Sequence, residues 1–140
     1  MYRYPNETYV VADLKGIRDT PGQVENLIKN VASHDSSSVR IMSQQDPGSA
    51  GVKEAESFIR MLRGYDVHVT TMSKDKFTRA KPVSAQCEGA NVRLLRAPWN
   101  EEFLREVENF PDAAHDDIVD VLSGAFNQLA ETGFSIIDAL

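Results

Sequence analysis

The segment of the chain best suited to chemistry is an acidic one at the start of an apolar helix pattern. It holds Asp116, Asp117 and Asp120, with His115 directly before them. Residues three or four apart lie on one side of a helix, so these carboxylates would repel one another by roughly 0.2–0.5 kcal/mol per pair. A hard divalent cation, which prefers oxygen ligands, would remove that repulsion. The spacing is therefore compatible with a metal site.

Acidic residues also suit the beginning of an ordinary helix. The helix macrodipole favours a carboxylate in the first turn by roughly 0.3–1 kcal/mol. Asp112 or Asp116 can serve as the N-cap residue. His115 can bind a metal, relay a proton or cap the helix. The segment alone leaves the metal site and the purely structural interpretation open.

A second candidate, Asp46, lies in the Gly-rich segment Gln-Asp-Pro-Gly-Ser-Ala-Gly of residues 45–51. A strand pattern precedes it and a helix pattern begins near Val52. Open α/β sheets place ligand-binding groups at the carboxyl ends of strands, next to such turns. An ordinary Asp-Pro-Gly turn has the same sequence. No Gly-Lys-Ser/Thr follows, so the segment is not a phosphate-binding P-loop.

Hydrophobic periodicity and capping residues predict the elements that would position these acids. The first part of the chain alternates strand and helix, which is typical of a parallel α/β arrangement with right-handed connections. Strands are expected over residues 8–14, 38–43, 66–70 and 91–95, and helices from Thr20-Pro21 onward and over 52–63, 101–109 and 115–130.

Length and composition indicate one globular domain of 140 residues, with 41% hydrophobic and 26% charged residues. No apolar run approaches the roughly 20 residues that span a bilayer, and the first residues lack the apolar core of a signal peptide. A cytoplasmic location is expected. The single cysteine, Cys87, excludes an internal disulfide and a multi-cysteine zinc site.

The net charge of −6 argues against a protein that coats nucleic acid non-specifically. Positive charge is nevertheless concentrated in residues 74–81, which include Lys74, Lys76, Arg79 and Lys81 and one acid. Such a segment can contact DNA phosphates or can be a solvated loop. The sequence favours neither interpretation.

Four segments in this order resemble a known family: "SQQDPGSAGV", "LRGYDVHV", "DKFTRAKPVSAQCEGANVRLLRAPWNEEFLREVENFP" and "HDDIVDVLSGAF". Over about residues 8–130 the chain is similar to the C-terminal nuclease domain of tailed-phage terminase large subunits. The resemblance implies a ribonuclease H-like fold, in which helices flank a mixed sheet. It also implies a nuclease that cuts concatemeric viral DNA into genome lengths for packaging. Residues 131–140 are expected to form a tail.

The resemblance also implies roles for the acidic residues. Asp46 matches the acid at the end of the fourth strand of that fold. Asp116 and Asp117 match the acids that open the last helix, Asp120 follows one turn later, and His115 matches a histidine often found there. The implied metal ligands are Asp46, Asp117 and Asp120, and the implied catalytic residues are Asp46, His115, Asp116 and Asp117. Two Mg²⁺ or Mn²⁺ ions are the implied cofactors.

The chain departs from the family pattern at its N-terminus. The family fold begins with a hairpin whose central strand carries the first essential aspartate, whereas residues 8–14 resemble the strand after it. We therefore expect residues 1–140 to form a single, N-terminally truncated domain without the ATPase domain, encoded by a prophage. Its metal site would then be incomplete and its nuclease weak or inactive. The resulting open sheet edge is a template for a homodimer.

Partners expected from the resemblance are double-stranded DNA, the terminase small subunit and the portal, in the host cytoplasm. Two other functions are open on the sequence alone. One is a non-catalytic packaging module, which would not bind metal. The other is a resolvase-like junction nuclease, which would prefer four-way junctions to linear duplex.

Overall fold

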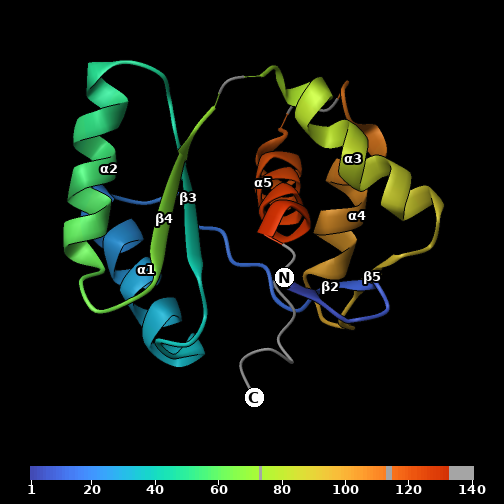
Figure 1. The fold of residues 1–140 in the computed structure, drawn as a ribbon, viewed down its shortest axis with the longest axis horizontal. Helices are drawn as coiled ribbons and strands as arrows, with labels where there is room; N and C mark the ends of the chain where they lie inside the picture. Colours follow the sequence, from blue (N-terminus) through green and yellow to red (C-terminus); the bar gives the residue numbers. More distant parts are fainter. Residues whose placement is uncertain (73, 113–114, 133–140) are drawn as a thin grey trace. The chain divides into compact units, whose positions relative to one another are not determined.

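A computed structural model describes residues 1–72, 74–112 and 115–132 of the chain, which form two compact units. Unit 1 comprises residues 1–15 and the part of the chain after residue 73. Unit 2 comprises residues 16–73. Figure 1 shows helices beside short strands within each unit, so the expected α/β class is confirmed.

Unit 1 contains a three-stranded sheet in the order β1 (Tyr2–Arg3), β2 (Tyr9–Val11) and β5 (Val92–Leu94). β2 pairs antiparallel with β1 and parallel with β5, so the sheet is mixed. The helices of this unit are α3 (Lys76–Glu88), α4 (Asn100–Asn109) and α5 (Asp117–Thr132). Both α3 and α4 pack against α5 (Figure 1).

The core of unit 1 joins β2 to α5. Tyr9 and Val11 are both buried because alternate residues of a strand point to the same face. The Tyr9 ring centroid lies 4.6 Å from that of Phe126 in α5, and Val83 of α3 and Phe103 of α4 complete the contact. Burying one such side chain contributes roughly 1.5–3 kcal/mol. This apolar core fixes α5, and with it the acids at its start.

Unit 2 contains two parallel strands, β3 (Ile41–Gln45) and β4 (Val67–Thr71), and the helices α1 (Pro21–Asp35) and α2 (Ser49–Met61). Thr20 is the N-cap residue of α1 and Pro21 its first residue, as the sequence predicts. Helix α2 packs along β3 (Figure 1). Asp46 follows the last residue of β3 directly, so its predicted place at the carboxyl end of a parallel strand is confirmed.

From Lys76 onward the basic segment forms the first turns of α3, a helix that the sequence did not predict. α3 contains Pro82, whose missing N–H and ring usually argue against a helix interior. Its tertiary contacts with α5 and β5 offset that local preference.

The strand pairing also differs from the expected succession of parallel neighbours. The parallel partner of β2 is β5, far along the chain, and the described residues form two sheets instead of one continuous sheet. Strand β1 has too short a pattern to be predicted, and its residues, Tyr2 and Arg3, include no carboxylate. α5 extends to Thr132, beyond the predicted end at residue 130. The rest of the expected tail, residues 133–140, lies outside the described residues.

Within the described ranges, no helix combines the length and the apolar character needed to cross a membrane.

We predict that Gly51→Ala destabilises the loop that carries Asp46. A Cβ atom at Gly51 would overlap with the backbone carbonyl of Asp46, and overpacking of this kind costs about 1–3 kcal/mol. The matched control is Gly22→Ala in α1, where a Cβ would meet nothing within 4 Å. That substitution should be neutral or stabilise by up to about 1 kcal/mol. Urea unfolding of both variants tests this, and equal stabilities would contradict it.

Candidate functional site

The site is built from the start of α3 and the start of α5, both in unit 1. Asp75 is the N-cap residue of α3, and its carboxylate accepts hydrogen bonds from the Thr78 backbone N–H at 2.9 Å and the Thr78 hydroxyl at 2.7 Å. These bonds, the backbone one first, hold the pKa of Asp75 below its usual value. The cap fixes where α3 begins, and therefore where Lys76 lies.

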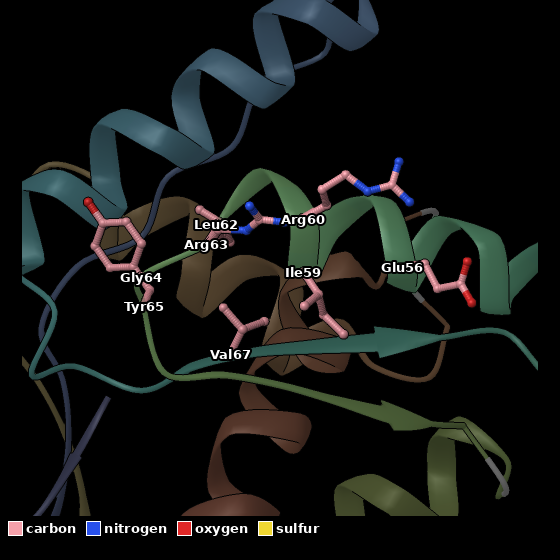
Figure 2. A pocket seen from close by; sticks show the side chains of 8 residues that line it. All are labelled: Glu56, Ile59, Arg60, Leu62, Arg63, Gly64, Tyr65 and Val67. Atoms are coloured by element: carbon pink, nitrogen blue, oxygen red, sulfur yellow. The ribbon is translucent and has the colours of Figure 1, made fainter.

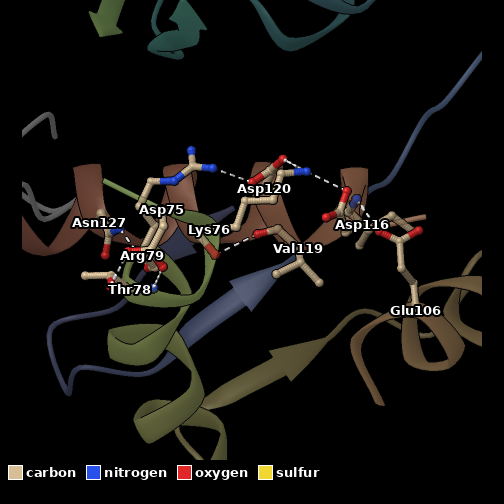
Figure 3. Close-up of polar contacts among 11 residues, drawn as sticks. Asp75, Lys76, Thr78, Arg79, Glu106, Asp116, Val119, Asp120 and Asn127 are labelled. Atoms are coloured by element: carbon tan, nitrogen blue, oxygen red, sulfur yellow. Dashed lines mark hydrogen bonds and ion pairs between the residues drawn. The ribbon is translucent and has the colours of Figure 1, made fainter. Parts of the chain in front are cut away.

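Two cations of α3 face two acids of α5 (Figure 3). Lys76 Nζ lies 2.5 Å from Asp116 Oδ1 and 2.7 Å from Asp120 Oδ2. Arg79 Nη2 lies 2.7 Å from Asp120 Oδ1. The hydrogen bonds to Asp116 and then Asp120 raise the pKa of Lys76 above its usual value. The two acids are therefore held together by cations from another helix.

The two cations differ in burial. The side chain of Arg79 is only 10% exposed and that of Asp120 22%, whereas Lys76 is 42% exposed and Asp116 35%. Asn127 of α5 also donates a hydrogen bond to the Arg79 backbone carbonyl at 3.2 Å. Arg79 is thus a fixed part of the interface between α3 and α5, and Lys76 lies at its open edge.

The cap of α5 shows what the Asp116 side chain does. The Asp116 carbonyl accepts a hydrogen bond from Asp120 N–H, so Asp116 has the backbone position of an N-cap residue. The Ile118 N–H, which an N-cap side chain often binds, instead donates to Glu106 Oε1 of α4 at 2.5 Å. Glu106 therefore caps the helix, and the Asp116 carboxylate turns to Lys76.

The other predicted site residues are exposed. In unit 1, His115 and Asp117 lie at the surface at the start of α5, and Lys74 and Lys81 lie at the surface near α3. Lys81 Nζ lies 5.1 Å from the centroid of the Phe77 ring. Asp46 is exposed in unit 2.

The structure thus brings together Asp116, Asp120, Lys76 and Arg79. Across residues 1–72, 74–112 and 115–132, no three histidine, cysteine, aspartate or glutamate side chains form a group that could hold a metal. Two carboxylates do converge on a single cationic centre, the Lys76 ammonium. Mg²⁺ in phosphoryl-transfer sites is often held by only one or two carboxylates, with water and substrate phosphate as the other ligands. The pair fits that donor set.

Unit 2 contains an open pocket of about 490 Å³ between the second half of α2 and the start of β4. Figure 2 shows Ile59 and Val67 between the helix and the strand, with the Arg60 side chain directed away from the strand. None of the predicted site residues lines this pocket. We therefore do not assign it to the candidate site.

Sequence reasoning missed Glu106 and Asn127, and it did not pair the basic segment with the acidic one. Glu106, in "FLREVENF", gave no signal beyond an amphipathic helix, because its capping role depends on α5. One signal did exist: Lys76 and Arg79 are three residues apart and Asp116 and Asp120 are four apart, and both spacings place residues on one face of a helix.

The fold and the site describe an α/β domain whose last helix begins with clustered acids. A family model described as the terminase RNaseH-like domain matches residues 4–129. Because the match covers most of the chain, the protein belongs to this family, and its domain is of the ribonuclease H-like class. No curated protein and no solved structure matched the chain.

We predict that the pair Arg79–Asp120 contributes more to stability than the pair Lys76–Asp116. Double-mutant cycles with Arg79→Met, Asp120→Asn, Lys76→Met and Asp116→Asn measure each coupling by chemical unfolding. The partly buried pair should give about 1–3 kcal/mol, since a largely desolvated charge left alone is costly. The exposed pair should give at most about 1 kcal/mol. The reverse ranking would contradict the structure.

We also predict that Glu106 stabilises the start of α5. Glu106→Ala should lower the free energy of unfolding by about 1 kcal/mol, because the Ile118 N–H loses its acceptor. Glu106→Gln keeps an acceptor oxygen and should cost less. Glu108→Ala, on an exposed position of the same helix, is the control. Hydrogen exchange at Ile118 should quicken in Glu106→Ala alone; unchanged exchange would count against this cap.

Proposed function

We propose that the chain is the metal-dependent endonuclease domain of a phage terminase, which cuts concatemeric viral DNA for packaging. The observation that carries the proposal is the convergence of Asp116 Oδ1 and Asp120 Oδ2 on one cation, at 2.5 and 2.7 Å from Lys76 Nζ. Membership of the terminase RNaseH-like family supports the same function.

The donors suit Mg²⁺ or Mn²⁺, because both prefer carboxylate oxygens to sulfur or imidazole ligands. When bound, such ions polarise the phosphate and lower the pKa of the attacking water, and two ions can do so together. In the proposed site Asp116, Asp117 and Asp120 supply oxygens from the start of α5. Asp46, which follows β3 in unit 2, is a further proposed metal ligand.

The remaining residues bind or orient the substrate in this proposal. His115, exposed beside the acids, relays a proton. Lys74 and Lys81, which are exposed, contact the DNA backbone and fix its register. Lys76 and Arg79 act first on the acids, and Arg79 holds Asp120 in place through its bond to Oδ1.

The proposed partners are double-stranded DNA, the terminase small subunit and the portal, in the cytoplasm of a bacterial host that carries the phage as a prophage. A homodimer through an edge of the β1-β2-β5 sheet is part of the proposal, since unpaired strand edges are templates for further pairing. Light scattering at high protein concentration tests it.

A second candidate is a non-catalytic packaging module that keeps the fold without the chemistry. The observation that favours it is that Lys76 and Arg79 already neutralise Asp116 and Asp120. Metal binding separates the two candidates, because a module whose acids serve only the interface between helices has no need of a cation.

We predict that the chain binds Mn²⁺ and nicks plasmid DNA weakly, and that Asp46→Asn and Asp117→Asn each weaken binding by at least about tenfold and abolish nicking. Calorimetry and a nicking assay on the same samples measure both. Asp35→Asn, an exposed acid at the end of α1, is the control for loss of one negative charge.

If the wild type binds Mn²⁺ but does not nick plasmid DNA, its function is restricted to metal binding. Absence of both would favour the non-catalytic module. Linear duplex and four-way junctions should be compared in the same assay, since a preference for junctions would favour a resolvase-like enzyme.

A further inference from the structure

We propose that Lys76 is a built-in competitor for the metal and sets the metal affinity of the acids at the start of α5. This inference rests on the proposed function. Its basis is that the Lys76 ammonium occupies the point at which Asp116 Oδ1 and Asp120 Oδ2 converge (Figure 3).

The oxygens of Asp120 are divided between two cations. Oδ1 binds Arg79 and Oδ2 binds Lys76. Departure of Lys76 therefore frees one oxygen on each acid, Asp116 Oδ1 and Asp120 Oδ2, while Arg79 still orients Asp120. These are two of the protein oxygens that an incoming divalent cation would take.

Lys76 is the cation that can leave. Its side chain is 42% exposed, so the ammonium can withdraw into water on a flexible four-carbon stem. An exposed ion pair of this kind contributes little to stability, so breaking it costs little. Arg79, only 10% exposed, cannot leave in the same way, because its departure would leave the partly buried carboxylate of Asp120 without an opposite charge.

A lysine and a divalent cation cannot occupy the same point, because like charges at contact distance repel strongly. The affinity for metal is therefore lowered by the cost of displacing Lys76. In the absence of metal, the same lysine relieves the repulsion between Asp116 and Asp120 and keeps both side chains aimed at the site.

The experiment is a calorimetric Mn²⁺ titration of the full chain and three variants, with circular dichroism as a folding check. Lys76→Met should bind at least about tenfold more tightly than the wild type, since it removes the competing charge. Lys76→Arg keeps the charge and should not tighten binding. Lys53→Met removes an exposed positive charge from α2 and should leave the affinity for Mn²⁺ unchanged.

Should Lys76→Met fail to fold, chemical labelling of the wild type tests the same inference. Acylation of lysines, read by mass spectrometry, should increase severalfold at Lys76 on addition of Mg²⁺, with Lys74 as internal reference. Unchanged labelling at Lys76 under saturating metal would overturn the inference.

The outcomes separate this inference from the proposed function. Wild type and Lys76→Met that bind Mn²⁺ equally well, or a variant that binds more weakly, would overturn the competition but leave the metal site intact. No binding by any of the four proteins would overturn the proposed function, and the inference with it.

Discussion

The contact between the first turns of α3 and α5 is the interaction on which the rest of unit 1 depends. Two carboxylates four residues apart on α5 would repel each other, and Lys76 and Arg79 supply the opposite charge from a helix 40 and 41 residues earlier. The same interface continues as an apolar contact through Val83 and Phe126 to the strand residue Tyr9. Charge neutralisation at one end and burial at the other therefore hold α5 in a single position on the sheet.

The two cations, Lys76 and Arg79, differ in burial and therefore in their contribution to the structure. Arg79 is nearly enclosed and hydrogen-bonded to α5 from both its guanidinium and its backbone carbonyl, so it is part of the packing. Lys76 lies at the open edge, where an ion pair can be exchanged for another cation at little cost. Glu106 completes the arrangement by capping Ile118, because the Asp116 side chain is then available to face Lys76. In this polar interface Arg79 is thus part of the packing, whereas the ion pairs of Lys76 can be exchanged.

The proposed catalytic acids come from both units. Asp46 ends β3 in unit 2, where Gly51 allows the turn to fold back close to the Asp46 carbonyl. The acids of α5 belong to unit 1. Asp46 lies at the carboxyl end of a strand, where α/β sheets usually place ligand-binding groups.

Much of the local structure could be predicted from the sequence: the start of α1 at Pro21, the strands β3, β4 and β5, the acidic start of α5, and the family. These features depend on periodicity and capping, which act over a few residues. Tertiary structure alone decided that β2 pairs with β5, that Glu106 caps α5, and that the basic segment is a helix despite Pro82. It also joined the acidic and basic segments, for which the sequence suggested separate roles in metal and DNA binding. The physical reason is that a charge or a strand edge does not encode its distant partner locally; the partner is fixed when burial of the common core brings the elements together.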